Sequence, residues 1–419
     1  MDNYKIQITG RKELAGTIKV SGAKNASLPE LAAAILSDSD IRLNGIPVVE
    51  DVKTMITALE SIGASGNFSN NSVNINFSSI KVPKVSDLIS KTSRSSILIL
   101  GPLLARHGYA EVSLPGGCAI GDRRINFHLE GLKRMGASIK LADGYIVART
   151  KGLKGTNYTF PGISVTGTEN LIMAATLADG ETVLSNCAVE PEISDLIRFL
   201  KSMGANISGE GTNTVRINGK SILSGASHKV IPDRIEMGTY VIAACLNRND
   251  IEVTNCIPEY IGSLLNILEK MGIGIRISGD KISVKVPSNL SPVDVSTAPY
   301  PGFPTDLQAQ LTMFLTQIDG ISHIKENIFN NRFKHVEELN KLGADITISG
   351  NAVEIRGVSE LKGAHLEATD LRASASLVLG GLIAEGDTLI ENSYQLFRGY
   401  EEMPEKLRNL GAEIKVLKV

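Results

Sequence analysis

The pattern of hydrophobic and polar positions repeats six times along the chain. In each repeat, apolar residues spaced three or four positions apart, such as Ile193, Leu196 and Leu200, predict an amphipathic helix that ends at a glycine. A glycine at this position supplies the left-handed backbone that stops a helix. Successive glycines are about 70 residues apart, so six repeats account for the 419 residues of the chain. The six are Gly63, Gly136, Gly204, Gly272, Gly343 and Gly411.

Two alternating segments joined by a short turn follow each glycine, and this pattern predicts a β-hairpin. Asp143-Gly144, Gly279-Asp280 and Gly350-Asn351 occupy such turns. A second, more apolar helix precedes each amphipathic one and is followed by a short β-rich run. The repeat therefore reads β-α-β-α-β-β, with two helices packed on a four-stranded sheet in an α/β layer. The second helices are expected at residues 28–37, 94–106, 169–178, 236–246, 305–318 and 372–384.

The two ends of the chain bear on its domain organisation. The sixth repeat stops at Val419 with one strand after its last helix, and residues 4–9 offer the missing strand. The N-terminal segment is therefore predicted to pair with the sheet of the last repeat. Six repeats divide most simply into two halves of three. We expect one domain over residues 22–231 and a second, discontinuous domain made of residues 1–21 and 232–419.

Composition and charge exclude several classes of protein. Hydrophobic residues make up 42% of the chain, enough for a large core, and the net charge is -2, which excludes a generally basic nucleic-acid binder. The N-terminus carries no signal-peptide pattern, and no apolar stretch is long enough to span a bilayer. None of the four cysteines has a zinc-ligand or CxxC spacing. We therefore expect a soluble, cytoplasmic protein without a metal site, a nucleic-acid partner or membrane insertion.

Cations gather where the apolar helices begin. Four of the six helices have Lys or Arg at or near the first residue, the unfavourable end of the helix dipole for a cation. A helix N-terminus beside a cation is an anion site. The alternative is pairing with a neighbouring acid, as of Asp233 with Arg234. As a set, the cations favour a ligand that carries phosphate, carboxylate or both. They are Lys24, Arg94, Arg234 and Arg372.

A glycine-rich loop over residues 115–121 stands where other repeats have a tight strand-to-helix turn. Such a loop lets a ligand approach the backbone closely. Cys118 lies in it with two arginines just beyond, and these cations are expected to lower the pKa of the thiol. Cys118 could then exchange a proton or act as a nucleophile near neutral pH. Cys187, Cys245 and Cys256 lack such surroundings, and we assign them to packing.

Asp306 lies at the start of the fifth apolar helix. One interpretation is helix capping, to which an aspartate beside a helix start is well suited. The other is a carboxylate held among cations, able to accept a proton from a substrate hydroxyl. The local residues leave both interpretations open.

Four segments resemble the enolpyruvyl transferases, and the resemblance extends over the whole chain. They are Gly22-Ala23-Lys24-Asn25-Ala26, Pro115-Gly116-Gly117-Cys118-Ala119-Ile120-Gly121, Phe303-Pro304-Thr305-Asp306-Leu307-Gln308-Ala309-Gln310 and Asp370-Leu371-Arg372-Ala373-Ser374-Ala375-Ser376. The resemblance implies two inside-out, barrel-like α/β domains, each of three β-α-β-α-β-β repeats. The branch that it most resembles transfers the enolpyruvyl group of phosphoenolpyruvate to the 3′-hydroxyl of UDP-N-acetylglucosamine and releases phosphate. This reaction is the first committed step of peptidoglycan biosynthesis, and it proceeds by addition and elimination through a tetrahedral ketal.

The resemblance also implies roles for individual residues. Cys118 matches the proton donor and Asp306 the base that takes the acceptor's proton, and Lys24 and Arg398 join them as catalytic residues. Positions that match phosphoenolpyruvate contacts are Lys24, Asn25, Arg123 and Arg398. Positions that match nucleotide-sugar contacts are Arg94, Arg123, Arg124, Ile125, Asn126, Phe127, Ser164, Val165, Asp306 and Ile328. From the helix starts we add Arg234 and Arg372 to the substrate-binding set, and we expect no metal ion and no cofactor.

The sequence departs from the family's pattern at one position and leaves two other functions to consider. Many members have a lysine ahead of a Val-Ser-Val run, but here Gly162 precedes Ile163-Ser164-Val165, so that lysine contact to the uridine diphosphate is absent. One alternative is the shikimate-pathway branch, which has Lys-Ser after the first strand and lacks the glycine-flanked cysteine. Asn25 and Cys118 argue against it. The other is a non-catalytic sensor of nucleotide sugars, and the presence of all four catalytic candidates argues against that.

Overall fold

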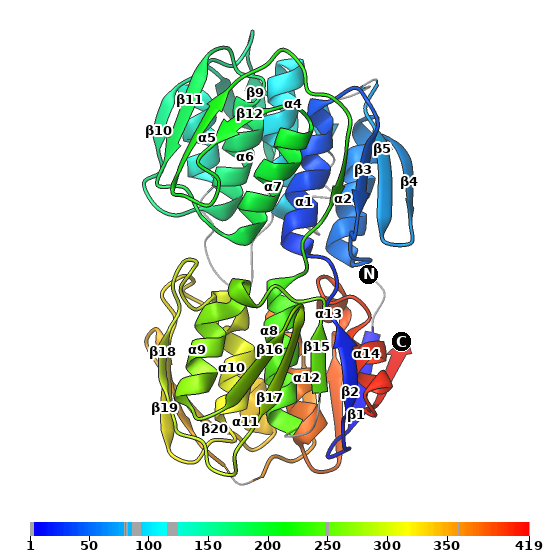
Figure 1. Cartoon of the computed structure of the whole chain (residues 1–419), viewed down its shortest axis with the longest axis vertical. Helices are drawn as coiled ribbons and strands as arrows, with labels where there is room; N and C mark the ends of the chain where they lie inside the picture. Colours follow the sequence, from blue (N-terminus) through cyan, green and yellow to red (C-terminus); the bar gives the residue numbers. More distant parts are fainter. Residues whose placement is uncertain are drawn as a thin grey trace. The chain divides into compact units, whose positions relative to one another are not determined.

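The computed structural model describes residues 4–78, 80, 83–85, 94–114, 125–247, 251–358 and 360–418. These residues divide into two compact units. The first unit holds the described residues between 22 and 231. The second unit holds residues 4–21 together with those from 232 onward. Figure 1 labels the helices and strands of both units.

Three four-stranded sheets form in the described part of the first unit. In each sheet a parallel edge strand is followed by antiparallel neighbours, in the orders β14-β3-β5-β4, β6-β7-β9-β8 and β10-β11-β13-β12. Buried and exposed positions alternate, as in β3, where Ile41 and Leu43 are buried and Arg42 is exposed. The strands are β3 (Ile41–Asn44), β4 (Ser65–Ser69), β5 (Ser72–Asn76), β6 (Lys84–Val85), β7 (Tyr109–Ser113), β8 (Ser138–Ala142), β9 (Tyr145–Arg149), β10 (Asn157–Thr159), β11 (Glu181–Ser185), β12 (Asn206–Ser208), β13 (Thr214–Asn218) and β14 (Ala226–Lys229).

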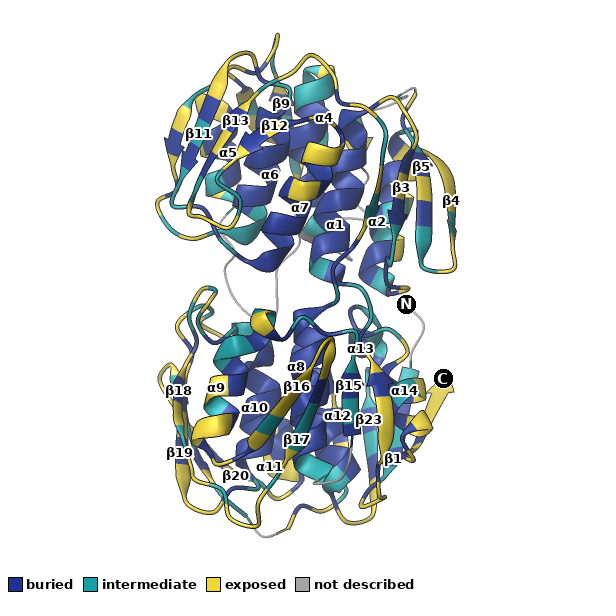
Figure 2. Ribbon diagram, in the orientation of Figure 1, coloured by how far each residue is buried: buried dark blue, intermediate teal, exposed yellow. Residues whose placement is uncertain are grey.

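The helices of the first unit are of two kinds. The inner ones are buried on nearly every side and pack on one another: α1 (Lys24–Ala33) with η1 (Ala34–Leu36), η2 (Arg94–Ile99) with α4 (Leu100–His107), and α6 (Val165–Ala175). The outer helices α2 (Glu50–Ile62), α5 (Asn126–Arg134) and α7 (Pro191–Ser202) expose one face. Figure 2 shows the inner helices as buried almost throughout. A helix that is apolar all round is stable only in such an interior position.

The second unit repeats this plan. Its sheets have the orders β16-β17-β15-β2, β18-β19-β21-β20 and β22-β23-β1-β24. The strands are β1 (Tyr4–Thr9), β2 (Gly16–Lys19), β15 (Ile251–Thr254), β16 (Gly274–Ser278), β17 (Lys281–Lys285), β18 (Asp294–Ser296), β19 (Ile321–Lys325), β20 (Asp345–Ser349), β21 (Ala352–Arg356), β22 (His365–Glu367), β23 (Asp387–Glu391) and β24 (Glu413–Lys418). The inner helices are α8 (Arg234–Asn247), η4 (Thr305–Leu307) with α10 (Gln308–Leu315), and α12 (Leu371–Ile383). The remaining helices are η3 (Pro258–Ile261), α9 (Gly262–Lys270), α11 (His335–Lys341), α13 (Tyr394–Phe397) and α14 (Met403–Asn409).

The N-terminal strand completes the sheet of the last repeat, as predicted. Strand β1 lies between β23 and β24 and is antiparallel to both, with Ile6 opposite Ile390 and Val416. Strand β2 then pairs in parallel with β15 of the second unit, although α1, the helix that follows it, lies in the first. Strand β14 pairs in parallel with β3 of the first unit, although α8, the helix that follows it, lies in the second. The repeat pattern did not predict which strands these two edge strands pair with.

The six repeat glycines have the predicted left-handed backbone. Their φ angles lie between 93° at Gly136 and 119° at Gly63. At Gly204 no atom lies within 4 Å of where a Cβ would stand, so the backbone conformation, and not lack of space, calls for glycine there. The three predicted hairpin turns are confirmed as two-residue loops, which join β8 to β9, β16 to β17 and β20 to β21.

Several inner helices differ from their predicted bounds. The helix α1 begins at Lys24 instead of residue 28, and α10 ends at Leu315 instead of residue 318. The helix α6 begins at Val165 instead of residue 169, because the Ser164 hydroxyl accepts a hydrogen bond from the Gly167 N–H at 3.2 Å and caps the helix there. The predicted helix over residues 94–106 is a 3-10 turn followed by the shorter α4. Pro102 has no backbone N–H and cannot donate the α-helical hydrogen bond to the carbonyl four residues before it. A continuous α-helix through this segment would therefore have one hydrogen bond fewer.

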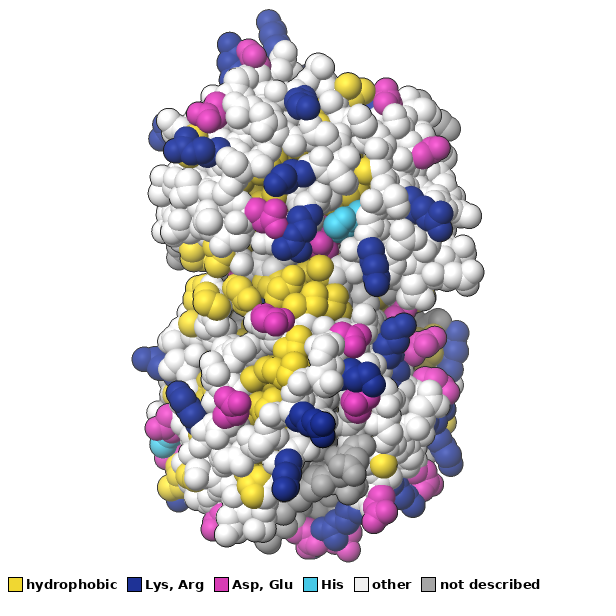
Figure 3. Space-filling model, in the orientation of Figure 1, with side chains coloured by type: hydrophobic (Ala, Val, Ile, Leu, Met, Phe, Trp, Pro, Cys, Tyr) yellow, Lys and Arg dark blue, Asp and Glu magenta, His cyan; other side chains and the backbone are white. Residues whose placement is uncertain are grey.

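None of the helices in the described part of the chain is long and apolar enough to cross a bilayer. On the face that Figure 3 shows, Lys and Arg side chains are interspersed with Asp and Glu, as a net charge of -2 leads one to expect.

Candidate active site

Charged side chains meet at the starts of the inner helices of the second unit. Arg234 is the first residue of α8, Arg372 the second residue of α12, and Asp306 lies in η4 directly before α10. Asp370 caps α12 by accepting hydrogen bonds from two backbone N–H groups, one of them that of Arg372. Asp233 accepts from two N–H groups of α8 in the same way. Both aspartates therefore satisfy the exposed N–H groups of a helix start.

The Asp306 carboxylate is held between two buried arginines. Its Oδ1 accepts a hydrogen bond from Arg332 Nη2 at 2.6 Å, and its Oδ2 accepts one from Arg372 Nη2 at 2.9 Å. The arginine side chains are only 5% and 6% exposed, whereas that of Asp306 is 25% exposed. The N-cap of η4 is Pro304, so the interpretation of Asp306 as a helix cap is wrong. The carboxylate among cations is the arrangement that the structure contains.

Sequence reasoning missed Arg332, because it lies in a loop before α11 and not at a helix start. It donates to Asp306 and, through Nη1, to the Thr305 hydroxyl at 3.1 Å. Its guanidinium also lies over the Phe329 ring, 5.2 Å from the centroid. The clearest available signal was a lone arginine among apolar and amide residues, which is too weak to separate from a surface residue.

Arg372 is the other cation beside Asp306, and the acid that it pairs with is distant in sequence. Burial by itself lowers the pKa of Arg372, but the Asp306 carboxylate outweighs it and holds that pKa above its ordinary value. The guanidinium also lies over the Tyr400 ring, 5.6 Å from the centroid. The interpretation that the Arg372 side chain pairs with an acid next to it in the sequence is therefore wrong, because its partner is Asp306.

The structure also describes the three other expected residues of the second unit, which are Ile328, Arg234 and Arg398. Ile328 is half-buried, and its N–H donates to Glu326, which also binds Thr305 beside Asp306. The Arg234 guanidinium lies over the Tyr300 ring, 5.7 Å from its centroid. Arg398 directly follows α13, is half-buried and donates to the Gln395 side chain at 3.2 Å.

In the first unit, the cation at the start of α1 is paired with an acid. The Lys24 ammonium lies 3.2 Å from Oδ2 of Asp51 on α2, and both side chains are about nine-tenths buried. Asn25 follows as a half-buried residue on the first turn of α1. Loss of one partner of a buried pair of this kind would leave the other as an uncompensated charge.

Five of the expected nucleotide-sugar contacts of the first unit lie around the start of α5. Ile125 is the N-cap of α5, and Asn126 and Phe127 are its first two residues. A Cβ added at Gly162 would lie 3.7 Å from the Phe127 ring, so the segment that leads to Ser164 and Val165 runs beside this turn. The structure thus brings these five expected residues into one neighbourhood.

Several expected residues cannot be placed. Cys118, Arg123 and Arg124, with the glycine-rich loop, lie outside the described residues, and so does the side chain of Arg94 at the start of η2. The other cysteines lie where they were predicted. Cys187, Cys245 and Cys256 are buried and free, which confirms their assignment to packing.

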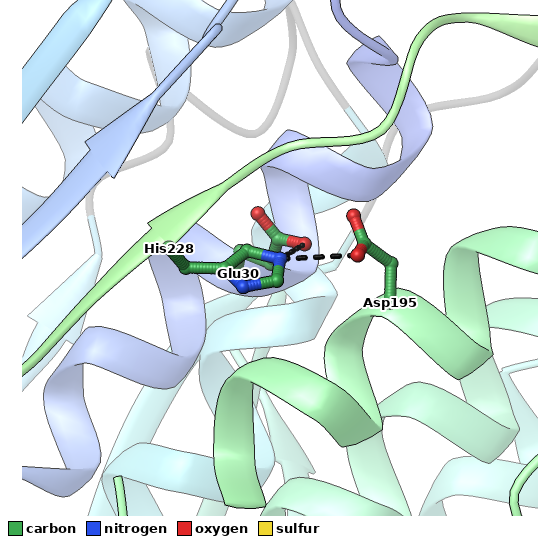
Figure 4. Close-up of side chains that lie close together, drawn as sticks. All are labelled: Glu30, Asp195 and His228. Atoms are coloured by element: carbon green, nitrogen blue, oxygen red, sulfur yellow. Dashed lines mark hydrogen bonds and ion pairs between the residues drawn. The ribbon is translucent and has the colours of Figure 1, made fainter. Parts of the chain in front are cut away.

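A buried charge cluster that the sequence did not indicate joins α1, α7 and β14 (Figure 4). His228 Nε2 lies 3.0 Å from Oδ1 of Asp195 and 3.5 Å from Oε1 of Glu30. Among the described residues, these three are the group whose ligand-type atoms lie close enough together for a metal ion, within 4.8 Å of one another. The 3.0 Å contact is a hydrogen bond, which places a proton between His228 and Asp195, and we interpret the cluster as a charge pair.

The cluster is expected to make the first unit less stable in alkali. Burial alone would lower the pKa of His228, but its bonds to Asp195 and Glu30 raise it to about 9, while burial raises the pKa of Glu30 to about 8. Both groups therefore bind protons more tightly when folded, and their stabilisation is lost as pH rises through the range from about 5 to 9. The loss attributable to His228 should be about 2 kcal/mol between pH 6.5 and 9.

Urea unfolding at several pH values checks this. The variant His228→Gln, which cannot be charged, should show a smaller fall in the free energy of unfolding over that range. His365→Gln, which alters an exposed histidine paired with Glu391, should keep the wild-type slope. An unchanged slope in His228→Gln would contradict the assignment.

Comparisons with known proteins agree with one another. The family described as EPSP synthase (3-phosphoshikimate 1-carboxyvinyltransferase) matches residues 8–407. The UDP-N-acetylglucosamine 1-carboxyvinyltransferase of Koribacter versatilis is 50% identical over 415 residues, which cover 98% of this chain and 96% of that protein. A protein of the same name from Magnetococcus marinus is 49% identical and covers 99% of each chain. The solved enolpyruvyl transferase NikO from Streptomyces tendae matches with a TM-score of 0.90 at 23% identity over 100% of both chains, which confirms the predicted fold class.

Proposed function

We propose, since the chain belongs to the UDP-N-acetylglucosamine 1-carboxyvinyltransferase family of enolpyruvyl transferases, that it transfers the enolpyruvyl group of phosphoenolpyruvate to the 3′-hydroxyl of UDP-N-acetylglucosamine. Phosphate is the second product, and the sugar product enters peptidoglycan synthesis. The structural observation that carries the chemistry is the Asp306 carboxylate held by Arg332 and Arg372.

Asp306 serves as the base in this proposal. Two guanidinium groups favour its ionised form, and its partial exposure leaves it accessible to a hydroxyl group. As the acceptor oxygen attacks the central carbon of phosphoenolpyruvate, Asp306 takes the hydroxyl proton. The resulting neutral carboxyl group still accepts hydrogen bonds from the two arginines, so the proton transfer breaks none of the contacts that hold Asp306 in place.

The addition also needs a proton donor, and we assign that role to Cys118 from the resemblance. Protonation of the terminal vinyl carbon produces an oxocarbenium-like centre, which the acceptor oxygen attacks to form the tetrahedral ketal. In the elimination step, the carbon–oxygen bond to phosphate breaks and the new methyl group loses a proton, which restores the double bond. The net change exchanges the hydroxyl proton for the enolpyruvyl group and releases inorganic phosphate.

Cations supply the affinity for phosphoenolpyruvate in this proposal. Lys24, Asn25, Arg123 and Arg398 hold its phosphate and carboxylate, because charge-assisted hydrogen bonds to such groups are strong. Lys24 pairs with Asp51 in the structure, so a bound anion would share or replace that contact. Arg234 and Arg372 add positive charge at the helix starts of the second unit.

The nucleotide sugar is assigned to the remaining residues. The neighbourhood formed by Ile125, Asn126, Phe127, Ser164 and Val165 supports this, because it offers an aromatic ring, helix-start N–H groups and polar side chains together. We assign Arg94, Arg123, Arg124 and Ile328 to the same ligand from the resemblance. Gly162 leaves this site without the lysine that many relatives have.

The reaction fits a cytoplasmic protein. Both substrates are intracellular phosphate esters, and buried free thiols such as Cys187 persist in a reducing compartment. We propose no nucleic-acid partner and no membrane insertion. The two small molecules are the partners that the proposed reaction requires.

Phosphate release with each acceptor tests the proposal. The chain should release phosphate from phosphoenolpyruvate with UDP-N-acetylglucosamine and not with shikimate 3-phosphate. The reverse pattern would point to the shikimate branch. Binding of the nucleotide sugar without any phosphate release would point to the sensor.

A further inference from the structure

A buried glutamate stands behind the candidate base. Glu326 directly follows β19 and is 3% exposed. Its backbone is fixed on both sides, since its N–H donates to the Asn351 carbonyl at 2.8 Å and its own carbonyl accepts from the Asn351 side chain at 3.1 Å. A carboxylate buried in this way is stable only if its oxygens accept enough hydrogen bonds.

Four donors converge on the Glu326 carboxylate. Its Oε1 accepts from the Thr297 hydroxyl at 2.8 Å, the Ile328 N–H at 2.7 Å and the Phe329 N–H at 3.1 Å. Its Oε2 accepts from the Thr305 hydroxyl at 2.7 Å. The two oxygens therefore serve different segments: Oε1 holds the turn that carries Ile328, and Oε2 holds the start of η4.

The bond to Thr305 also sets the direction of a chain of hydrogen bonds. Because the single hydroxyl proton of Thr305 points to Glu326, the oxygen's lone pairs are free to accept from Arg332 Nη1 at 3.1 Å. Arg332 then donates through Nη2 to Asp306 Oδ1 at 2.6 Å. Phe329, which Glu326 also holds, lies beneath the same guanidinium. Arg332 is thus positioned from two sides by contacts that begin at Glu326.

We propose that Glu326 is a positioning residue, which orients Asp306 through Thr305 and Arg332 and at the same time holds the Ile328 backbone. The inference rests on the proposed function, in which Asp306 takes the acceptor's proton and Ile328 contacts the nucleotide sugar. Glu326 touches neither substrate in this scheme. It links the base to the binding of the acceptor, so that the hydroxyl and the carboxylate meet in one geometry.

The variant Glu326→Gln tests the link with little change of shape. Three donors converge on Oε1, so the carbonyl oxygen of the glutamine stays there and its NH2 group faces Thr305. The Thr305 hydroxyl must then accept from both the NH2 group and Arg332, and its own proton loses its acceptor, so the position of Arg332 is no longer fixed. We expect kcat to fall about tenfold to a hundredfold, with KM for phosphoenolpyruvate within about twofold of wild type. KM for UDP-N-acetylglucosamine should rise several-fold, because a neutral amide oxygen accepts from the Ile328 and Phe329 N–H groups more weakly than a carboxylate does.

A second pair of variants separates the two arms of the network. Thr305→Val removes the hydroxyl and should lower kcat as much as Glu326→Gln does, while KM for the nucleotide sugar stays unchanged because the Ile328 turn keeps its bonds. Thr305→Ser keeps the hydroxyl and should recover most of the turnover. Glu354→Gln is the matched control, an acid on β21 of the same sheet paired with Arg356, and it should leave all constants unchanged.

The outcomes distinguish this inference from the proposed function. A wild-type chain that releases no phosphate overturns the proposed function and this inference with it. An active wild type with kcat unchanged in both Glu326→Gln and Thr305→Val overturns the inference alone. If Glu326→Gln does not fold, the Thr305 pair decides, because a merely structural role predicts equal loss in the serine and valine variants and no split between kcat and KM.

Discussion

Replacing Asp306 by asparagine is expected to lower kcat about a hundredfold or more, because an amide cannot accept the proton of the acceptor hydroxyl. The affinity for phosphoenolpyruvate should be kept or increased, since Arg332 and Arg372 lose their anionic partner and attract a substrate anion more strongly. Steady-state kinetics with both substrates varied, together with calorimetry of phosphoenolpyruvate binding, measure the two effects.

The matched control for this prediction is Asp294→Asn, which changes an exposed carboxylate on β18 paired with His323. It should leave both constants unchanged. Equal losses of kcat and of phosphoenolpyruvate affinity in Asp306→Asn would mean that Asp306 mainly holds the two arginines in place. A kcat near that of wild type would remove Asp306 from the chemistry altogether.

Cys118→Ser should lose most of the turnover, whereas Cys118→Asp should keep a substantial part. A serine hydroxyl is a far poorer proton donor than a thiol at neutral pH, whereas a carboxyl group can still donate a proton if its pKa is raised. The wild-type thiol should also be alkylated by fosfomycin, an epoxide phosphonate, and faster when the nucleotide sugar is bound. The aspartate variant should resist fosfomycin, because it has no thiolate to open the epoxide.

Peptide mass mapping after fosfomycin treatment locates the adduct. Burial raises the pKa of Cys187 to about 11 and that of Cys256 to about 12, so these thiols stay protonated and serve as internal controls. An adduct on one of them, or a Cys118→Asp variant that folds properly but has no activity, would remove Cys118 from the role of proton donor.

Much of the architecture could be predicted because it depends on short stretches of sequence. The glycine that ends each amphipathic helix needs only its own left-handed backbone, so Gly63 and Gly204 mark helix ends without reference to the rest of the fold. The missing strand of the last repeat could be assigned to residues 4–9 by counting, and β1 pairs there. At α6 the Ser164 side chain caps the helix, and the hydrophobic periodicity alone placed the helix start four residues too late.

The candidate site was predictable only in part, for a related reason. Arg234, Asp306 and Arg372 stand out because helix starts are local features that charge patterns reveal. Arg332 and Glu326 lie in a loop and after a strand, where nothing in the neighbouring residues distinguishes them from surface positions. Their importance comes from the partners that they meet.

The repeat, the order of helices and strands, the glycines that end the amphipathic helices and the family could thus be predicted from the sequence alone, since each depends on spacing within about 70 residues or on short motifs. Which charges meet could be learned only from the folded structure. Arg332 and Arg372 reach Asp306 from 26 and 66 residues away, and His228 meets Glu30 across most of the first unit. Such contacts depend on how the buried helices and sheets pack. Two charges that are distant in the sequence become partners only when packing removes both from water at the same place.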